Sequence, residues 1–244
     1  MKRILLKVAY DGTNYAGWQV QKNANTVAGE INKILSGLLR EEISVLGASR
    51  TDSGVHSMGN VAIFDTESSV DGDKFAYILN SQLPEDIRVL ESKEVVESFH
   101  PHKCKSTKTY RYTIDNGPIL LPTKRLYSSP VKQRLDVDAM KEAAKFLIGE
   151  HDFKSFCSIN TTARTTIRRV IDIDVDRNED TVTIDVMGEG FLYNMVRIIA
   201  GTLVEVGLRR RTIASVGDTL KAVDREEAGK TMPARGLCLM KIEY

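Results

Sequence analysis

The stretch Gly47–Ser57, GASRTDSGVHS, is where an apolar run of the sequence gives way to polar residues. The six residues 43–48 predict a short, largely buried strand, and Arg50–Gly54 predicts a loop directly after it. Asp52 is therefore expected on a loop that a rigid strand supports, which is typical of active-site residues. An Asp two residues before a Gly also occurs in ordinary turns, where its carboxylate accepts backbone N–H groups. This stretch alone leaves both interpretations open.

The composition is that of a globular protein. The chain has 244 residues, of which 42% are apolar and 27% charged, enough for one large domain or two small ones with a shared core. No apolar run approaches the roughly 18 residues that a membrane span needs. Lys7 interrupts the apolar part of the N-terminus, which predicts a strand and not a signal peptide. We therefore expect no contact with a membrane.

The three cysteines, Cys104, Cys157 and Cys238, are far apart and odd in number. They indicate neither a disulfide framework nor a zinc site, and a reduced cytoplasmic setting fits them. The cluster His100-Pro-His102-Lys-Cys104 matches no common ligand spacing, so no metal is expected there. The formal net charge of +1 does not by itself indicate a nucleic-acid partner.

Hydrophobic periodicity divides the chain into two halves with a similar order of elements. Residues 1–104 are expected to form strand, helix, strand, strand, helix and strand, and residues 105–244 repeat this order with one extra helix. This order favours an α+β fold with antiparallel sheets and helices on one face. No Pro- or Gly-rich linker separates the halves, so a shared sheet or a tight interface is expected. The expected strands are 3–9, 43–48, 60–64, 89–99, 109–115, 168–176, 181–187 and 237–242, and the expected helices are 27–39, 71–83, 136–148, 195–208 and 212–223.

The segment Lys108–Tyr112, KTYRY, alternates cations and aromatic rings. Such a pattern suits a single-stranded RNA or a flipped base, through stacking and phosphate contact. A surface strand with packed tyrosines and solvated lysines would have the same spacing, so this alternative stays open. Further basic clusters at Arg164 with Arg168-Arg169, and at Arg209–Arg211, are individually explained as solvated faces. Together with the Lys103–Arg111 stretch they favour an acidic polymer as partner.

Arg197 lies in a predicted helix that is apolar on nearly every side. Burial of an unpaired guanidinium is very costly, so Arg197 is expected to reach solvent or to meet a carboxylate. A structural ion pair and a functional one are both open. Motifs of nucleotide and metal enzymes, such as GxxxxGK[ST], GxGxxG, HExxH and GxSxG, are absent from the sequence, and nothing in it requires a cofactor.

Five segments together resemble the TruA family of tRNA pseudouridine synthases, in the order of that family and over nearly the whole chain. They are YDGTNYAGWQVQ (Tyr10–Gln21), SRTDSGVHSMGNV (Ser49–Val61), KTYRY (Lys108–Tyr112), FLYNMVRIIAGTL (Phe191–Leu203) and PARGLCL (Pro233–Leu239). The resemblance implies an isomerase that converts uridine to pseudouridine at positions 38, 39 and 40 of the tRNA anticodon stem-loop. It further implies a cytoplasmic homodimer without a cofactor, with two pseudo-symmetric halves of the pseudouridine synthase fold and an active-site cleft between them.

The resemblance also assigns roles to five residues. Asp52 is the essential catalytic residue, Tyr110 stacks on the target base, and Arg197 pairs with the catalytic aspartate. Leu237 lines the pocket, and Arg50 takes part in extruding the base. The reaction detaches uracil from C1′ and reattaches it through C5, so it is redox-neutral. An ionised Asp52 could act as nucleophile at C1′ or as base on the sugar, and the sequence leaves both open. A nearby Arg197 would lower the carboxylate pKa by roughly one to three units.

The sequence departs from the usual family motif at four positions. Serine stands for glycine at Ser49 and for alanine at Ser53 and Ser57, and isoleucine stands for histidine at Ile63. The residues with expected roles in the reaction are intact, so these departures affect the prediction of the substrate and not that of the reaction. The alternative substrate is another tRNA uridine or a ribosomal RNA uridine. A non-catalytic RNA-binding protein would need a changed residue at Asp52, and an aspartate-dependent hydrolase would need a second carboxylate or a metal.

Overall fold

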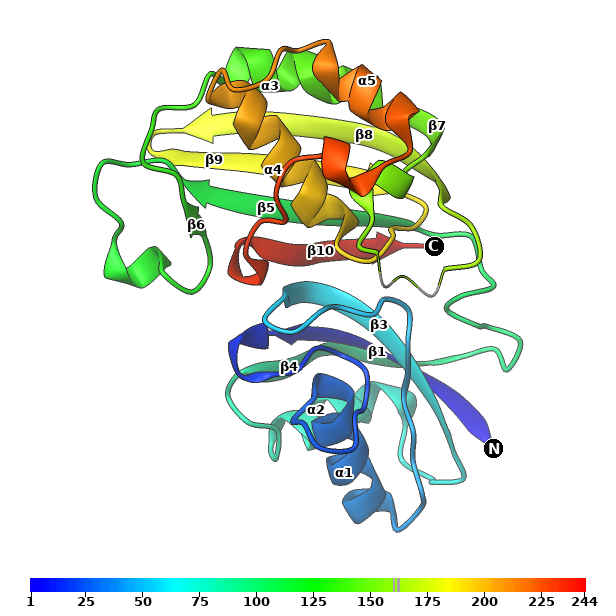
Figure 1. Ribbon diagram of the computed structural model, residues 1–244. Coiled ribbons are helices and arrows are strands. Elements are labelled where there is room, and N and C mark those ends of the chain that lie inside the picture. Colours follow the sequence, from blue (N-terminus) through cyan, green and yellow to red (C-terminus); the bar gives the residue numbers. More distant parts are fainter. Residues whose placement is uncertain (160, 162) are drawn as a thin grey trace. The chain divides into compact units, whose positions relative to one another are not determined.

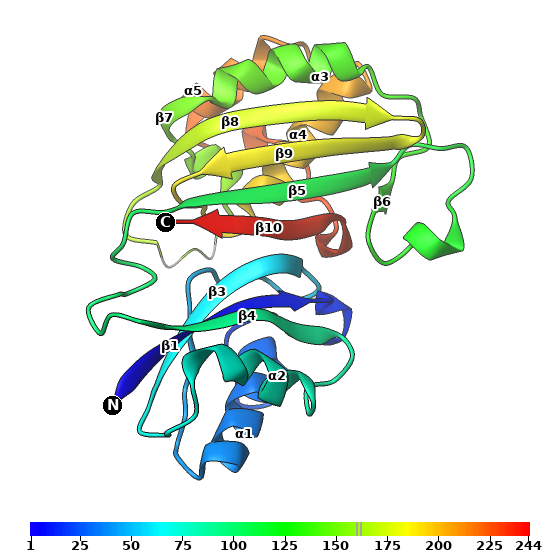
Figure 2. The same ribbon diagram turned by 180° about the vertical axis from the view of Figure 1, so that it is seen from behind.

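A computed structural model describes residues 1–159, 161 and 163–244. The chain forms two compact units, one of Met1–Ser106 with Leu239–Tyr244 and the other of Thr107–Cys238. Each unit combines helices with a mostly antiparallel sheet, as Figure 1 and the reverse view in Figure 2 show. The expected α+β class is therefore confirmed. Among the described residues, no helix has the length and apolar character needed to cross a membrane.

The sheet of the first unit is built on strand β1, which pairs antiparallel with β3 and β4, and β2 pairs antiparallel with β3. These strands are β1 (Lys2–Tyr10), β2 (Leu46–Gly47), β3 (His56–Thr66) and β4 (Ile87–Val95), and the helices are α1 (Val27–Leu39) and α2 (Phe75–Asn80). Alternate residues of β1 face opposite sides, because side chains alternate along a strand. Ile4 and Leu6 join a core with Ile31 of α1 and Phe75 of α2. Leu5 lies in a smaller cluster on the other side.

The strand expected at 43–48 is wrong in length, because only β2 forms there. Polar side chains of α1 provide the reason. Ser36 Oγ accepts a hydrogen bond from the Ile43 N–H at 3.0 Å, and Asn32 Oδ1 accepts one from the Val45 N–H at 2.8 Å. Buried backbone groups need a partner, and here the helix supplies it in place of a neighbouring strand.

The helix expected at 71–83 is also shorter, since α2 covers six residues after a 3-10 turn at Gly72–Lys74. The side-chain amide of Asn80 bonds to both the N–H and the C=O of Val89 in β4, each at 2.8 Å. These two bonds fix the end of α2 against the sheet. By contrast, α1 has the expected bounds, and Thr26 caps its start, with its Oγ1 accepting from the Gly29 N–H at 3.3 Å.

The sheet of the second unit runs β5, β9, β8, β7 with antiparallel pairs, and β6 pairs parallel with β5. Helix α4 crosses in front of β9 and β5 in Figure 1 and behind them in Figure 2, so it covers one face of this sheet. The elements are β5 (Thr107–Asp115), β6 (Ser129–Pro130), α3 (Val137–Ala144), β7 (Gly149–Asp152), β8 (Ile167–Asn178), β9 (Thr181–Gly188), α4 (Met195–Gly207) and α5 (Ser215–Ala222). The last strand, β10 (Leu237–Glu243), begins in this unit, and its residues from Leu239 on belong to the first unit. The two- and four-residue strands β6 and β7 were not expected, because so short a segment shows no alternation.

The two units share a pairing order. In the first, β1 pairs with β3 and β3 with the preceding β2. In the second, β5 pairs with β9 and β9 with the preceding β8 through a hairpin at Glu179, whose φ is 53°. The repeat of pattern expected from the sequence therefore has a counterpart in how each sheet is connected.

Candidate active site

The loop that carries Asp52 joins β2 to β3, and it forms a turn in which the Val55 N–H donates to the Asp52 C=O at 3.1 Å. The segment after β1 fixes this loop. The Trp18 N–H donates to the Thr51 C=O at 3.1 Å, and the Gly54 N–H donates to the Tyr15 C=O at 3.2 Å. The hydroxyls of Tyr10 and Thr51 are also bonded, at 2.7 Å. The YDGTNYAGWQVQ motif thus supports the aspartate loop.

Gly17 shows how closely these two segments approach. Its φ of 96° lies in the region that side chains rarely adopt, and a Cβ there would lie 2.4 Å from the Thr51 carbonyl oxygen. Only glycine fits at this position. Asp52 itself is half-buried and Arg50 is exposed on the same loop. The backbone at Asp52 forms a turn, and the neighbouring segment fixes this turn in place. The structure therefore agrees with both the turn and the active-site interpretation of Asp52.

Two of the unusual serines bond to backbone near the loop. Ser53 Oγ donates to the Tyr15 C=O at 3.3 Å. Ser57 Oγ accepts from the Asn60 N–H at 2.9 Å. These hydroxyls contribute to the shape of the loop, so the departures from the family motif have at least a structural role at these positions.

The second unit carries Tyr110, Arg197 and Leu237. Tyr110 lies on β5 opposite Val186 of β9, and its side chain packs edge-on against Phe191, with ring centroids 5.3 Å apart at 87°. The residue is 6% exposed. Burial also lowers the pKa of the Lys108 ammonium on the same strand. This end of β5 therefore carries both an aromatic pair and a cation that is largely removed from water.

Tyr112, two residues further along β5, has a structural position. It is fully buried, and its hydroxyl bonds to Ser129 Oγ at 2.6 Å and donates to the Pro233 C=O at 2.8 Å. Burial raises its pKa to about 12, so the phenol stays protonated at any physiological pH. Pro233 opens the PARGLCL segment, in which Leu237 is buried. The bond therefore links the strand of Tyr110 to the segment of Leu237.

Arg197 is half-buried on α4, and the structure shows how its guanidinium is accommodated. Nε donates to the Met232 C=O and Nη1 donates to Asn194 Oδ1, both at 2.6 Å. The Met232 N–H in turn donates to the Arg197 C=O at 3.2 Å. Gly201, one turn further along α4, permits this approach, because a Cβ there would lie 1.9 Å from the Lys230 C=O oxygen.

Within the second unit the structure thus links the segments of Tyr110, Arg197 and Leu237, through Tyr112 to Pro233 and through Arg197 to Met232. Asp52 and Arg50 belong to the first unit. The pairing of Arg197 with Asp52 stays a prediction. Sequence reasoning missed Asn194, and the only signal it offered was a polar residue at the start of an apolar helix.

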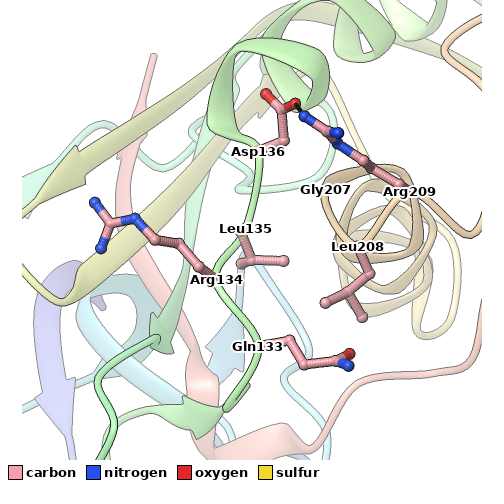
Figure 3. Close-up of a pocket in the computed structure, with 7 residues that line it drawn as sticks. All are labelled: Gln133, Arg134, Leu135, Asp136, Gly207, Leu208 and Arg209. Atoms are coloured by element: carbon pink, nitrogen blue, oxygen red, sulfur yellow. Dashed lines mark hydrogen bonds and ion pairs between the residues drawn. The ribbon is translucent and has the colours of Figure 1, made fainter.

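The hollow in Figure 3 has a volume of about 390 Å³ and lies between residues 133–136 and the end of α4. In Figure 3, Asp136 and Arg209 point toward one another, with Arg209 Nη2 3.3 Å from Asp136 Oδ2. Arg211 forms an ion pair with Glu205. Arg209 and Arg210 are exposed, which agrees with the interpretation of the Arg209–Arg211 cluster as a solvated face, although Arg209 and Arg211 each have an acidic partner. The five predicted site residues, all described, lie outside the lining of this hollow.

Comparison with known proteins defines the class. A family model described as tRNA pseudouridine synthase matches residues 7–107 and 143–244. A protein of Brevibacillus brevis named tRNA pseudouridine synthase A is 47% identical over 244 residues and covers all of both chains. A Clostridium tetani protein named tRNA pseudouridine synthase A 2 is 47% identical over 245 residues, with 100% of this chain and 99% of the relative covered. A Thermoanaerobacter protein, strain X514, is 45% identical over all of both chains.

A solved structure described as a Cbf5-Nop10-Gar1 complex aligns with 97% of this chain and 47% of that chain. Its identity is 15% and its TM-score 0.32, a value too low to carry an argument. The sequence matches are sufficient by themselves to identify the class of protein. They place the chain among the pseudouridine synthases, a class of isomerases. The chain belongs to the tRNA pseudouridine synthase family, as its five motifs predicted.

Proposed function

We propose that this protein isomerises uridine to pseudouridine at positions 38, 39 and 40 in the anticodon stem-loop of tRNA. It acts as a cytoplasmic homodimer and needs no cofactor. The observation that carries the proposal is the aspartate loop, in which the Arg-Thr-Asp motif is intact and its backbone is bonded to Tyr15 and Trp18. A loop that is fixed before substrate binds supports catalysis, because the reacting group is already positioned.

The proposed chemistry assigns Asp52 to the sugar. Its carboxylate attacks C1′, or removes a proton from the sugar, so that the bond between C1′ and the uracil nitrogen breaks. The uracil, released as its N1 anion, rotates so that C5 forms a bond to C1′. This step displaces the Asp52 carboxylate from C1′ or, in the second route, returns the sugar proton. C5 then loses its proton and N1 gains one, so the product is an isomer of uridine. Either role needs an ionised carboxylate, and a guanidinium within contact distance favours that form. Arg197 is proposed as this cation, since Asn194 and Met232 fix two edges of its guanidinium.

Tyr110 is proposed to stack on the flipped uracil, with Leu237 as a wall of the base pocket and Arg50 as the side chain that assists extrusion. Support comes from the order around Tyr110, whose ring is oriented by Phe191. Because the base must leave the helical stack, a preformed aromatic surface compensates for part of the stacking that it loses.

The test is pseudouridine mapping of total RNA from cells with wild-type protein, without it, and with Asp52→Ala. We expect modification at the three tRNA positions to disappear in the absence of the protein. In purified form, Asp52→Ala should reduce turnover by at least about 100-fold, because a catalytic carboxylate is lost. Its affinity for tRNA should stay near that of wild type.

Asp73→Ala is the matched control, since Asp73 is an exposed aspartate of the same unit and is not part of the site. It should behave as wild type in both assays. Full turnover by Asp52→Ala would end the proposed mechanism. Loss of pseudouridine from ribosomal RNA alone, with tRNA unchanged, would end the substrate assignment.

A further inference from the structure

A second hollow, about 570 Å³ in volume, lies in the second unit beside the start of α4. The five predicted site residues lie outside its lining, but Asn194, which bonds to Arg197, is part of it. Its lining comes from three segments of the chain. The residues are Ser158, Ile159, Tyr193, Asn194, Arg225, Glu226, Ala228, Gly229 and Lys230.

Two of the three walls are bonded to one another. The Ser158 N–H donates to the Tyr193 C=O at 3.2 Å. Asn194 Nδ2 donates to Ser158 Oγ at 2.8 Å. The backbone and the side chains therefore fix the same contact, and the separation between these walls is set before any ligand enters.

The third wall is fixed to α4. Ala228 and Gly229 are buried, and the Gly229 N–H donates to Thr202 Oγ1 at 2.9 Å. The Arg225 guanidinium donates to the Ala228 C=O at 3.3 Å and to Thr231 Oγ1 at 3.1 Å. Both of these acceptors are neutral, so Arg225 keeps its positive charge available to the hollow.

The chemistry of the lining suits a nucleotide. Tyr193 is 47% exposed and Ile159 81% exposed, so an aromatic ring and an alkyl chain both reach solvent at the hollow. Arg225 and the exposed Lys230 supply two positive charges against the one negative charge of Glu226. Aromatic rings with nearby cations bind nucleobases by stacking and phosphates by charge. A volume of this size is typical of pockets that bind small ligands.

The hollow also shares its walls with the segments that orient Arg197. Asn194 lines the hollow and accepts from Arg197 Nη1, while Lys230 lies two residues before Met232, which accepts from Arg197 Nε. An occupant of the hollow is therefore a close neighbour of the proposed catalytic cation. In an RNA chain, the group next to a nucleotide held at Arg197 is the adjoining nucleotide.

We propose that this hollow binds the nucleotide that adjoins the target uridine, with its base stacked on Tyr193 and its phosphate contacted by Lys230. The inference rests on the proposed function, because it requires a uridine in RNA as the substrate. It assigns part of the recognition of RNA sequence or shape to a subsite separate from the pocket for the reacting base.

The experiment uses an anticodon stem-loop RNA in which 2-aminopurine replaces the nucleotide on the 5′ or on the 3′ side of the target. We expect wild-type protein to quench the fluorescence at one of these two positions, because the probe stacks on Tyr193. Tyr193→Ala should abolish this quenching and raise KM about 5- to 150-fold, the range for loss of one stacked base. Tyr193→Phe keeps the ring and should keep both properties.

Tyr77→Ala is the matched control, because Tyr77 is an exposed tyrosine of the first unit and is 81% exposed. It should leave KM and quenching unchanged. Lys230→Ala should weaken binding and reduce its dependence on salt, as loss of one phosphate contact does. Equal KM and equal quenching in Tyr193→Ala and Tyr77→Ala would overturn the subsite. A wild-type protein that quenches through Tyr193 but makes no pseudouridine would instead overturn the proposed function and leave this binding site standing.

Discussion

Asn194 is the residue on which the geometry of Arg197 depends most directly. Its φ of 61° is left-handed, a conformation that asparagine tolerates better than most residues. In this conformation its amide lies between two partners, accepting from Arg197 and donating to Ser158. The side chain therefore orients the guanidinium from outside the helix, and we regard Asn194 as a positioning residue.

Replacement of Asn194 by glycine tests this role. Glycine keeps the left-handed backbone but removes the amide, so Arg197 loses a charge-assisted hydrogen bond. We expect kcat to fall about 10- to 150-fold, since such bonds contribute on the order of 1.5 to 3 kcal/mol, with a small change in KM. Asn194→Ala should show the same kcat and in addition lose about 1 kcal/mol in urea unfolding, because alanine is strained at this φ. A kcat equal to wild type in both variants would contradict the positioning role.

At this scale the sequence offers candidates for the reacting residues but not for their partners. Asp52, Tyr110, Arg197 and Leu237 follow from motifs, because each sits at a fixed place in a contiguous segment. The partner of a side chain is set by tertiary contact. Ser158 and Asn194 meet across 36 residues of chain, and no local pattern of either segment encodes that distance.

Helix starts follow local rules more closely than other element boundaries. Thr26 and Asp136 cap α1 and α3 through bonds to backbone groups three residues on, so the short-range sequence suffices to predict them. The ends of α2 and the length of β2 depend on bonds from Asn80 to β4 and from Asn32 to residue 45. These bonds join different elements, and periodicity within one element does not contain them.

The pairing of β1 with β3 yields a prediction about pH. Arg3 and Asp65 are opposite one another in the register, and two parallel hydrogen bonds join them, each 2.7 Å long. This pair lowers the pKa of the Asp65 carboxyl from its ordinary 3.8, chiefly through the side-chain hydrogen bond. A lowered folded-state pKa means that the contribution to stability is present above pH 3.8 and is lost as pH falls through the folded value.

We therefore expect Asp65→Asn to reduce the free energy of unfolding by about 1 kcal/mol at pH 7, a value limited by the partial exposure of the pair. The difference from wild type should shrink as pH falls below 3.8, because wild-type Asp65 becomes protonated too. Urea unfolding at a series of pH values measures this, with the exposed Asp73→Asn as control. A difference that is constant with pH would exclude the ion pair as its cause.

At the scale of the whole molecule, the chain enters the second unit at Thr107 and returns to the first at Leu239. The last residue packs there, with the ring of Tyr244 5.0 Å from that of Phe99 and its hydroxyl donating to the Pro101 C=O at 3.2 Å. The sequence predicted two halves but not this return, because residues 237–242 give one uninterrupted strand pattern. The proposed site draws Asp52 from the first unit and Tyr110 from the second.

A homodimer could build such a site in two ways, from the two units of one chain or from units of different chains. We propose the first, and mixing two inactive variants separates them. Asp52→Ala and Tyr110→Ala, the second of which removes the stacking ring, are unfolded and refolded together, and light scattering checks that dimers form. If each site belongs to one chain, every site in the mixed dimer lacks one group, and activity stays at the background of the separate variants. If the site spans two chains, half of the dimers have one intact site and about a quarter of the wild-type activity returns. Wild type refolded with Asp52→Ala is the control and should keep about half of its activity in either case. A quarter of the full turnover in the mixture of the two variants would overturn the single-chain site. The rest of the proposal would stand.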